Sequence, residues 1–214
     1  MPDWDRGSRQ LHENVISALR SARDSAQQKD APSLDLVREW HRLLMAGLKP
    51  TGGAKTSWFG QFRGEPGQES VRMKVQSVEA PAPNQVTALL KDFIETLSEG
   101  IVRFDDEIPS ATDSKVPGLS RGTVLAIIGL MAFAHGEWIR IHPFANGNGR
   151  TARLWANWIA MRYGLPPFVA VRPRPRAAYE TAARKSMKGD WRAMRPVFEQ
   201  MLHEFAVDVL TGQP

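Results

Sequence analysis

Residues 142–153 have the sequence His-Pro-Phe-Ala-Asn-Gly-Asn-Gly-Arg-Thr-Ala-Arg, with an apolar segment on either side. The segment before it, 125–138, and the segment after it, 151–163, both have the length and composition of buried helices. The pattern therefore predicts a loop that joins two core helices and ends at a helix N-terminus near Arg150.

The loop contains several backbone groups that suit an anion. Gly147 and Gly149 allow positive φ and leave the main chain open to a ligand, and successive amides in such a turn form an anion-binding concavity. The amides of Thr151 and Ala152 belong to the first turn of the predicted helix, where the positive end of the helix dipole adds to their effect. These features indicate a phosphate-binding turn.

Charged and titratable side chains complete the set. Arg150 and Arg153 are three residues apart, so we expect both to point to one face of the helix, each with a planar fork for phosphate oxygens. His142 lies at the other end of the loop, and an unperturbed imidazole titrates near pH ~6.5, so it accepts a proton at neutral pH. Each residue alone has an ordinary structural explanation. Their order between two apolar helices predicts a polyphosphate site beside a general base.

This run resembles the active-site signature of Fic-domain proteins, His-x-Phe-x-(Asp/Glu)-Gly-Asn-Gly-Arg-x-x-Arg. Every spacing is kept, and one specified position, Asn146, differs. Segments 60–63 and 80–83 resemble the ends of the family's flap, and 178–190 resembles its helical region after the signature, so the likeness covers about residues 35–205. It implies a mainly α fold, namely a Fic-type helical bundle with a short β-hairpin flap.

Most characterised Fic proteins transfer AMP from ATP to a hydroxyl of a target protein and release pyrophosphate. The resemblance therefore implies protein AMPylation, with His142 taking the proton of a target Ser, Thr or Tyr and Phe144 packing under the loop. Tyr179 would either stack on the base or only pack the start of a helix. The implied catalytic residues are His142, Asn148 and Arg150. The implied nucleotide-binding residues are Asn146, Gly147, Asn148, Gly149, Arg150, Thr151, Ala152, Arg153 and Tyr179.

Asn146 stands where the family has a carboxylate that helps to hold Mg²⁺. This ion prefers hard oxygen ligands and usually takes one or two carboxylates, so the neutral carbonyl of Asn146 should be a weak metal ligand. Three interpretations stay open. The protein uses Mg²⁺ held through water and phosphates, it uses another nucleotide-like donor, or its activity is largely lost.

Apolar and polar side chains alternate along the expected target-binding flap, which comprises Val71, Arg72, Met73, Lys74 and Val75. The alternation predicts a short strand, and an exposed strand pairs with an extended peptide through main-chain hydrogen bonds. We therefore expect the target protein to present its hydroxyl in an extended loop that pairs with about residues 71–76. The alternative is that the hairpin only packs on the helices.

Two further functions remain alternatives. One is a Fic relative that transfers another phosphate-containing group, such as phosphate or phosphocholine, and the other is a catalytically weakened nucleotide-binding module with a regulatory role. The family often has an inhibitory helix with the pattern (Ser/Thr)-x-x-x-Glu-(Gly/Asn). Here Glu99-Gly100 lacks a Ser or Thr at Glu95, and Glu13-Asn14 lacks one at Arg9. Inhibition by a separate small protein, inhibition by a degenerate N-terminal helix, and no inhibition all stay open.

Length and composition restrict the remaining choices. The 214 residues, 42% of them apolar, suit one Fic domain over 31–214 with an N-terminal helical extension over 1–30. The absence of cysteine excludes disulfides and thiol catalysis. No signal peptide is evident and no apolar run nears the ~20 residues of a membrane span, so we expect a cytoplasmic protein without a membrane partner. The net charge of +5 suits an anionic ligand but is too small to favour nucleic acid.

Periodicity and turn residues give the order of elements. His41 and His135 lie on predicted helices and are expected to be structural. A polar loop is predicted over 106–120. Helices are predicted over 9–28, 34–46, 84–99, 121–138, 151–163, 176–187 and 191–210.

Overall fold

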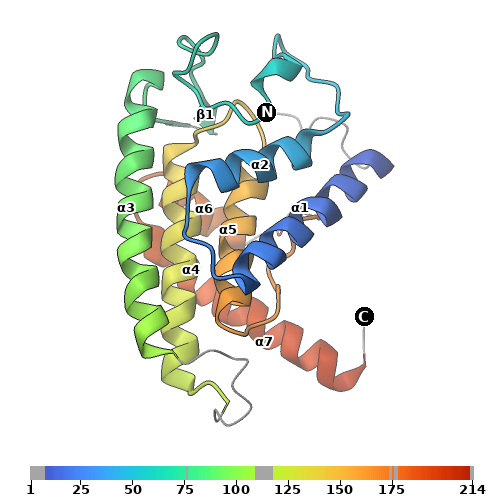
Figure 1. The fold of residues 1–214 in the computed structure, drawn as a ribbon, viewed down its shortest axis with the longest axis vertical. Helices are drawn as coiled ribbons and strands as arrows, with labels where there is room; N and C mark the ends of the chain where they lie inside the picture. Colours follow the sequence, from blue (N-terminus) through green and yellow to red (C-terminus); the bar gives the residue numbers. More distant parts are fainter. Residues whose placement is uncertain (1–7, 76, 109–117, 174, 176–177, 213–214) are drawn as a thin grey trace.

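Two adjacent helices, α4 (Arg121–Ile141) and α5 (Asn148–Arg162), form the centre of the bundle and pack against each other (Figure 1). Trp138 of α4 and Trp155 and Trp158 of α5 are fully buried. Burying a large apolar side chain contributes about 1.5–3 kcal/mol, so these aromatic rings are a major part of the core. The helices that flank the predicted loop are therefore also the helices that hold the fold together.

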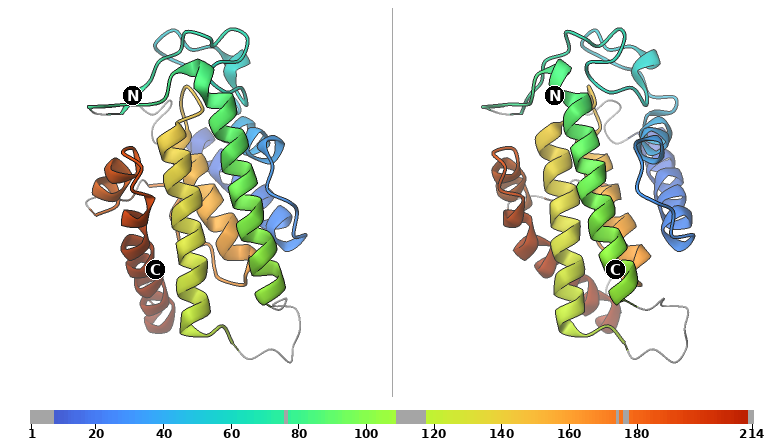
Figure 2. Two further views of the ribbon diagram at one scale, coloured as in Figure 1. Left: turned by 90° about the vertical axis from the view of Figure 1, so that its left-hand side faces the viewer. Right: turned by 60° about the vertical axis from the view of Figure 1, so that its left-hand side comes forward.

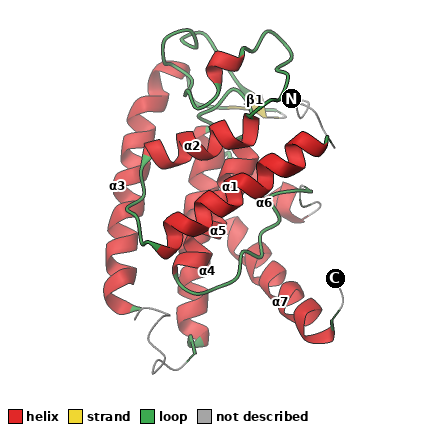
Figure 3. Ribbon diagram, turned by 45° about the vertical axis from the view of Figure 1, so that its right-hand side comes forward, coloured by secondary structure: helices red, strands yellow, loops and turns green. Residues whose placement is uncertain are grey.

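The computed structural model describes residues 8–75, 77–108, 118–173, 175 and 178–212. Helices dominate this part of the chain, and its strands form one antiparallel hairpin, so the predicted mainly α class is confirmed (Figure 3). The other elements are α1 (Arg9–Gln27), α2 (Leu34–Met45), η1 (Thr56–Trp58), β1 (Lys74–Val75), β2 (Val78–Glu79), α3 (Pro83–Glu107), α6 (Ala178–Ser186), η2 (Trp191–Met194) and α7 (Arg195–Thr211).

The outer helices surround the central pair. α1 and α2 cover α5, α3 lies beside α4, and α6 and α7 pack on the other side of α4 (Figure 2). The hairpin and the long connection before it lie at the end of the bundle where α4 ends and α5 begins (Figures 1 and 2). This end therefore brings together the signature loop and the flap.

α1 belongs to the same core as the later helices. Its small residues Ala18, Ala22 and Ala26 are buried in the main hydrophobic cluster, and the indole N–H of Trp158 donates to the Ser25 hydroxyl at 3.1 Å. Residues four apart share one face of a helix, so this alanine stripe lets α1 approach α5 closely. The domain boundary expected at residue 30 stays a prediction.

Several elements have bounds that differ from those predicted. α3 continues to Glu107, beyond the predicted end at residue 99. Gly100 lies inside this helix, where a Cβ would come within 3.0 Å of Leu130 Cδ1. Glycine at this position therefore lets α3 and α4 lie close together and does not end the helix. The strand predicted over 71–75 is confined to Lys74–Val75. The helix predicted over 191–210 is η2 followed by α7, which has a proline in its first turn. Residues 109–117 of the predicted loop lie outside the described residues.

Within the described residues, α4 is the one helix long and apolar enough to cross a membrane. It is mostly buried inside the bundle, and a central core helix has the same composition.

Candidate active site

The loop between α4 and α5 turns sharply at both ends. His142 ends α4 in the left-handed conformation (φ 51°), and Gly147 precedes α5 in the same region (φ 81°). A Cβ at Gly147 would lie 2.3 Å from Cε of Met45 and 3.2 Å from the His41 ring, so a larger residue would have to displace these two side chains of α2, and the positive φ itself favours glycine. α2 therefore packs directly against the loop.

Asn148 and His41 brace the loop from within. The Phe144 amide donates to Asn148 Oδ1 at 2.8 Å, and Asn148 Nδ2 donates to the Phe144 carbonyl at 2.7 Å. The ring of Phe144 is fully buried and stacks on His41 at 3.8 Å between centroids. His41 Nδ1 accepts from the Gly60 amide, so its Nε2–H donates to the Asn146 carbonyl at 3.0 Å. His41 is thus structural, as predicted, and the Asn148 side chain holds the loop instead of facing a ligand.

His142 is held as a neutral base. Its Nδ1 lies 3.2 Å from the Ile139 carbonyl, which can only accept, so the ring proton sits on Nδ1 and Nε2 has the lone pair. Burial lowers the pKa of His142 to about 4, the Arg63 charge adds to this effect, and the hydrogen bond to Ile139 opposes it. The half-buried imidazole is therefore neutral at pH 7 and can accept a proton.

The amides available to an anion differ from those predicted, because α5 begins at Asn148 and not near residue 150. The amide of Thr151 already donates to the Gly147 carbonyl at 3.0 Å. In any helix, the amides of the first residues have no carbonyl acceptor one turn earlier, so they can bind a ligand. Asn148 and Gly149 therefore take the place that the sequence assigned to Thr151 and Ala152.

Both arginines of the signature are buried, each with 3% of its surface exposed. Arg150 Nη2 lies 3.8 Å from Sδ of Met45 on α2. Arg153 donates from Nη1 to the Tyr179 hydroxyl at 2.9 Å and from Nη2 to the Val171 carbonyl at 3.1 Å. The two guanidinium groups therefore contact different neighbouring elements, and their shared role at the phosphates stays a prediction.

Tyr179, which the resemblance places beside the nucleotide base, is 2% exposed. Its hydroxyl contacts Arg153 and, at 2.7 Å, Nε2 of the fully buried His135. The ring has no exposed face for a purine in this structure, so a stacking role stays a prediction. The observed contacts fix Arg153 instead, and His135 is a core residue, as predicted.

The loop does not supply the ligands that Mg²⁺ favours. Oδ1 of Asn146 already accepts from the Gly147 amide at 2.6 Å, and an amide oxygen carries no net charge. Among the described residues, no group of three or more His, Cys, Asp or Glu side chains could hold a metal ion. The residues present therefore do not fit a tightly held Mg²⁺.

Arg63, for which the sequence predicted no role, joins the loop to the flap. Its guanidinium donates to the carbonyls of His142 (2.7 Å) and Ile141 (3.0 Å) at the end of α4. It also donates to the carbonyls of Pro81 (3.0 Å) and Val71 (3.2 Å) at the base of the hairpin. The side chain is fully buried, and burial lowers the pKa of Arg63 to about 10. In the sequence, the only indication of a role for Arg63 was the resemblance of residues 60–63 to one end of the family's flap.

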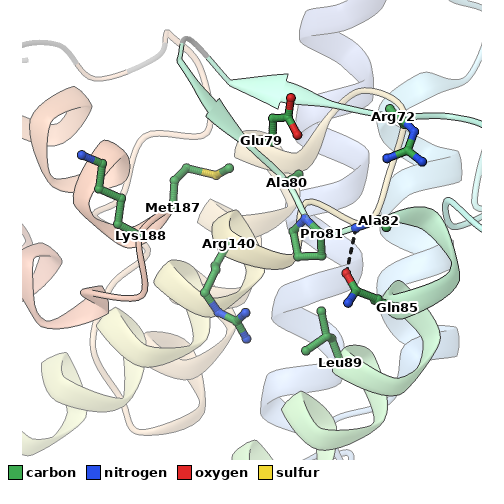
Figure 4. A pocket seen from close by; sticks show the side chains of 10 residues that line it. All are labelled: Arg72, Glu79, Ala80, Pro81, Ala82, Gln85, Leu89, Arg140, Met187 and Lys188. Atoms are coloured by element: carbon green, nitrogen blue, oxygen red, sulfur yellow. Dashed lines mark hydrogen bonds between the residues drawn. The ribbon is translucent and has the colours of Figure 1, made fainter.

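A pocket of about 540 Å³ lies between the flap and the helices beside the loop (Figure 4). Arg72 and Glu79 of the flap line it together with Met187 and Lys188, which follow α6. Arg140, which also lines it, lies two residues before His142 in the sequence, and the other lining residues also come from outside the signature. Of the predicted flap residues, Arg72 and Lys74 are exposed, Met73 is buried, and Val71 and Val75 are half-buried.

One of the two incomplete inhibitory motifs, Glu13-Asn14, does not place its glutamate at the site. The Glu13 side chain is 52% exposed and pairs with Arg9 at 2.8 Å. Asn14 instead donates to the carbonyls of Leu44 (3.2 Å) and Ala46 (2.7 Å), which ties α1 to the end of α2. The role of a separate inhibitory protein stays a prediction.

Residues 31–160, which span α2 to α5 and include the whole loop, match the sequence profile of the Fic/DOC family. The chain belongs to the Fic/DOC family. The matched residues include the loop that resembles the family signature, with Asn146 at its one differing position.

Relatives of known sequence and structure agree with this assignment. The chain is 29% identical over 186 residues to protein adenylyltransferase fic-1 of Caenorhabditis elegans, an alignment that covers 85% of this chain and 30% of that protein. The solved structure of C. elegans Fic-1 has a TM-score of 0.60 at 25% identity and covers 96% of this chain and 51% of that one. A Fic-domain signalling protein from Bacteroides thetaiotaomicron shares the fold, with a TM-score of 0.64 at 18% identity, 96% of this chain and 73% of that one. The chain thus spans 30% of the length of its curated relative.

Proposed function

We propose that this protein transfers AMP from ATP to a hydroxyl group of a target protein in the cytoplasm. The observation that carries the proposal is the neutral imidazole of His142 at one end of a loop whose other end has two buried arginines and open first-turn amides. The name of the C. elegans relative, a protein adenylyltransferase, favours AMP over other phosphate-containing groups.

In the proposed reaction, Nε2 of His142 removes the proton of the target hydroxyl as the hydroxyl oxygen attacks the α-phosphorus of ATP. The new oxygen–phosphorus bond forms while the bond from the α-phosphorus to the oxygen that bridges to the β-phosphate breaks, and pyrophosphate leaves. The amides of Asn148 and Gly149 and the charges of Arg150 and Arg153 would stabilise the phosphate oxygens. Phosphoryl transfer depends mainly on such positioning and charge stabilisation.

The pocket beside the flap would hold the nucleoside. Its volume of about 540 Å³ lies within the range of about 300–1,000 Å³ that small-molecule sites occupy. Leu89 and Met187 offer apolar surface to a base, and Arg72 and Lys188 offer polar groups at the rim. With the phosphates at the start of α5, ATP would then extend from the loop towards the flap.

The test uses ATP labelled at either the α- or the γ-phosphorus, incubated with this protein and the proteins of a cell extract. AMP transfer labels protein from α-labelled ATP only. Because kinases of the extract also use γ-labelled ATP, each label is compared with that of the same extract without this protein, and an excess from γ-labelled ATP would show phosphate transfer. Bound ATP with no excess label from either would indicate a nucleotide-binding module. Intact mass spectrometry of a labelled protein then measures whether the added group equals AMP.

A further inference from the structure

Arg153 is the first member of a buried chain of hydrogen bonds. Its Nη1 donates to the Tyr179 hydroxyl at 2.9 Å, and that hydroxyl lies 2.7 Å from Nε2 of His135. These three side chains come from α5, α6 and α4, and none is more than 3% exposed. The chain therefore links the second arginine of the signature to the centre of the bundle.

The direction of these hydrogen bonds follows from the chemistry of the groups. A guanidinium can only donate, so the Tyr179 oxygen accepts from Arg153 and its own proton is donated to His135 Nε2. His135 must then be neutral, in agreement with burial and the Arg153 charge, which lower the pKa of His135 to about 3. Removal of the Tyr179 hydroxyl would leave both of its neighbours without this partner.

The Arg153 guanidinium can also bind an anion. In the described part of the chain no carboxylate pairs with it, and its buried Nε has no hydrogen-bond partner. A Cβ added to Gly149 would lie 3.2 Å from Arg153 Nη1, so the guanidinium lies over the first turn of α5. An uncompensated buried charge is costly, which favours a bound anion at this position.

We propose that Tyr179, supported by His135, is a positioning residue that orients the Arg153 guanidinium for the terminal phosphates of a bound nucleoside triphosphate. Tyr179 thereby sets how strongly the site prefers a triphosphate to a monophosphate. This inference rests on the proposed function only in that the loop binds the phosphates of a nucleotide. It assigns Tyr179 to the phosphate end of the ligand and not to the base.

The experiment compares the dissociation constants of ATP, AMP and inorganic tripolyphosphate by calorimetry for wild type, Tyr179→Phe and Tyr163→Phe. The phenylalanine at 179 keeps the ring and removes only the hydroxyl that Arg153 contacts. Tyr163 is the matched control, because its hydroxyl is also buried but donates to the Ile101 carbonyl. We expect Tyr179→Phe to weaken ATP and tripolyphosphate about tenfold and AMP hardly at all, in line with a lost hydrogen bond to a charged group. Tyr163→Phe should leave the ratio of ATP to AMP affinity unchanged.

Three results would contradict the proposed role of Tyr179 and His135 in orienting Arg153, which we call the relay. A folded Tyr179→Phe protein with a wild-type ATP to AMP ratio would show that the hydroxyl does not position Arg153. Equal weakening of ATP and AMP would point to contact with the nucleoside or to a general structural defect. Loss of the same ratio in Tyr163→Phe would show that any buried hydroxyl has this effect. His135→Phe provides a second variant, with the same selective loss expected if Tyr179→Phe does not fold.

The relay and the proposed function fail in different ways. If tripolyphosphate affinity depends on Tyr179 while no AMP reaches any protein, the transfer function is wrong and the relay stands. If AMP is transferred but Tyr179→Phe binds ATP as wild type does, the relay is wrong and the function stands.

Discussion

Among single residues, His142 is the group on which we propose that proton transfer depends. We expect His142→Ala to lower the rate of AMP transfer by about 10²–10⁴, as is typical for the loss of a general base, and to leave ATP affinity close to wild type. Initial rates at saturating ATP and calorimetric binding measure the two effects. His203, exposed on α7, supplies the control variant His203→Ala. Retained transfer in His142→Ala would remove this residue from the mechanism.

Asn146 is the residue through which we propose to test whether the site can use a metal. Asn146→Asp keeps an oxygen acceptor for the Gly147 amide and adds a charged, hard ligand, so we expect stronger dependence on Mg²⁺ and faster transfer. Rates over a series of Mg²⁺ concentrations measure this. Asn148→Asp is the contrast, because it loses the donor to the Phe144 carbonyl and should lower the melting temperature instead. If Asn146→Asp is no faster with ATP, the site is adapted to another donor or geometry.

Among the elements, the hairpin carries the edge that we propose for pairing with a target peptide, along β1. Lys74 pairs with Glu79, and the Ala80 amide donates to the Met73 carbonyl at 3.0 Å. Hydrogen-bonded and non-hydrogen-bonded pairs alternate in an antiparallel ladder, so the amide of Lys74 points away from β2. This outward amide is a better probe of target docking than Met73, whose side chain is buried.

We therefore expect Lys74→Pro to abolish modification of the target while ATP binding is retained, because proline removes the outward donor without breaking the bonds to β2. Lys74→Ala removes the charge but keeps the amide, and should remain active. Transfer rates and ATP affinity of both variants give the comparison. Full activity in a folded Lys74→Pro protein would place target docking elsewhere.

For the whole molecule, buried histidines make stability depend on pH. Burial lowers the pKa values of His41 and His135 to about 3, from an ordinary value of 6.5. The unfolded chain therefore binds more protons than the folded one below about pH 6.5, and stability falls as the pH drops from there towards 3. Each histidine contributes up to about 1.4 kcal/mol per pH unit. Urea unfolding at pH 7 and pH 5 measures this slope. Equal unfolding free energies at the two pH values would contradict the prediction.

The sequence predicted the helices well because their signals are local. Ser33, for example, accepts from the Leu36 amide and begins α2 as expected. The start of α5 could not be predicted in the same way, because it depends on Asn148 closing the loop through Phe144. The role of Arg63 depends on a contact with His142, 79 residues away, that no local pattern contains.

The buried Arg63 has a dynamic consequence. One guanidinium donates to carbonyls of both the flap and the end of α4. If either segment unfolded locally, the buried Arg63 would lose hydrogen-bond acceptors that water cannot replace inside the bundle. The two segments should then open as one cooperative unit. In hydrogen exchange, the Arg63 amide, bonded to the Pro143 carbonyl, and the Ala80 amide, bonded to the Met73 carbonyl, should therefore show similar opening free energies. A flap that exchanges orders of magnitude faster than the loop would show that the two move independently.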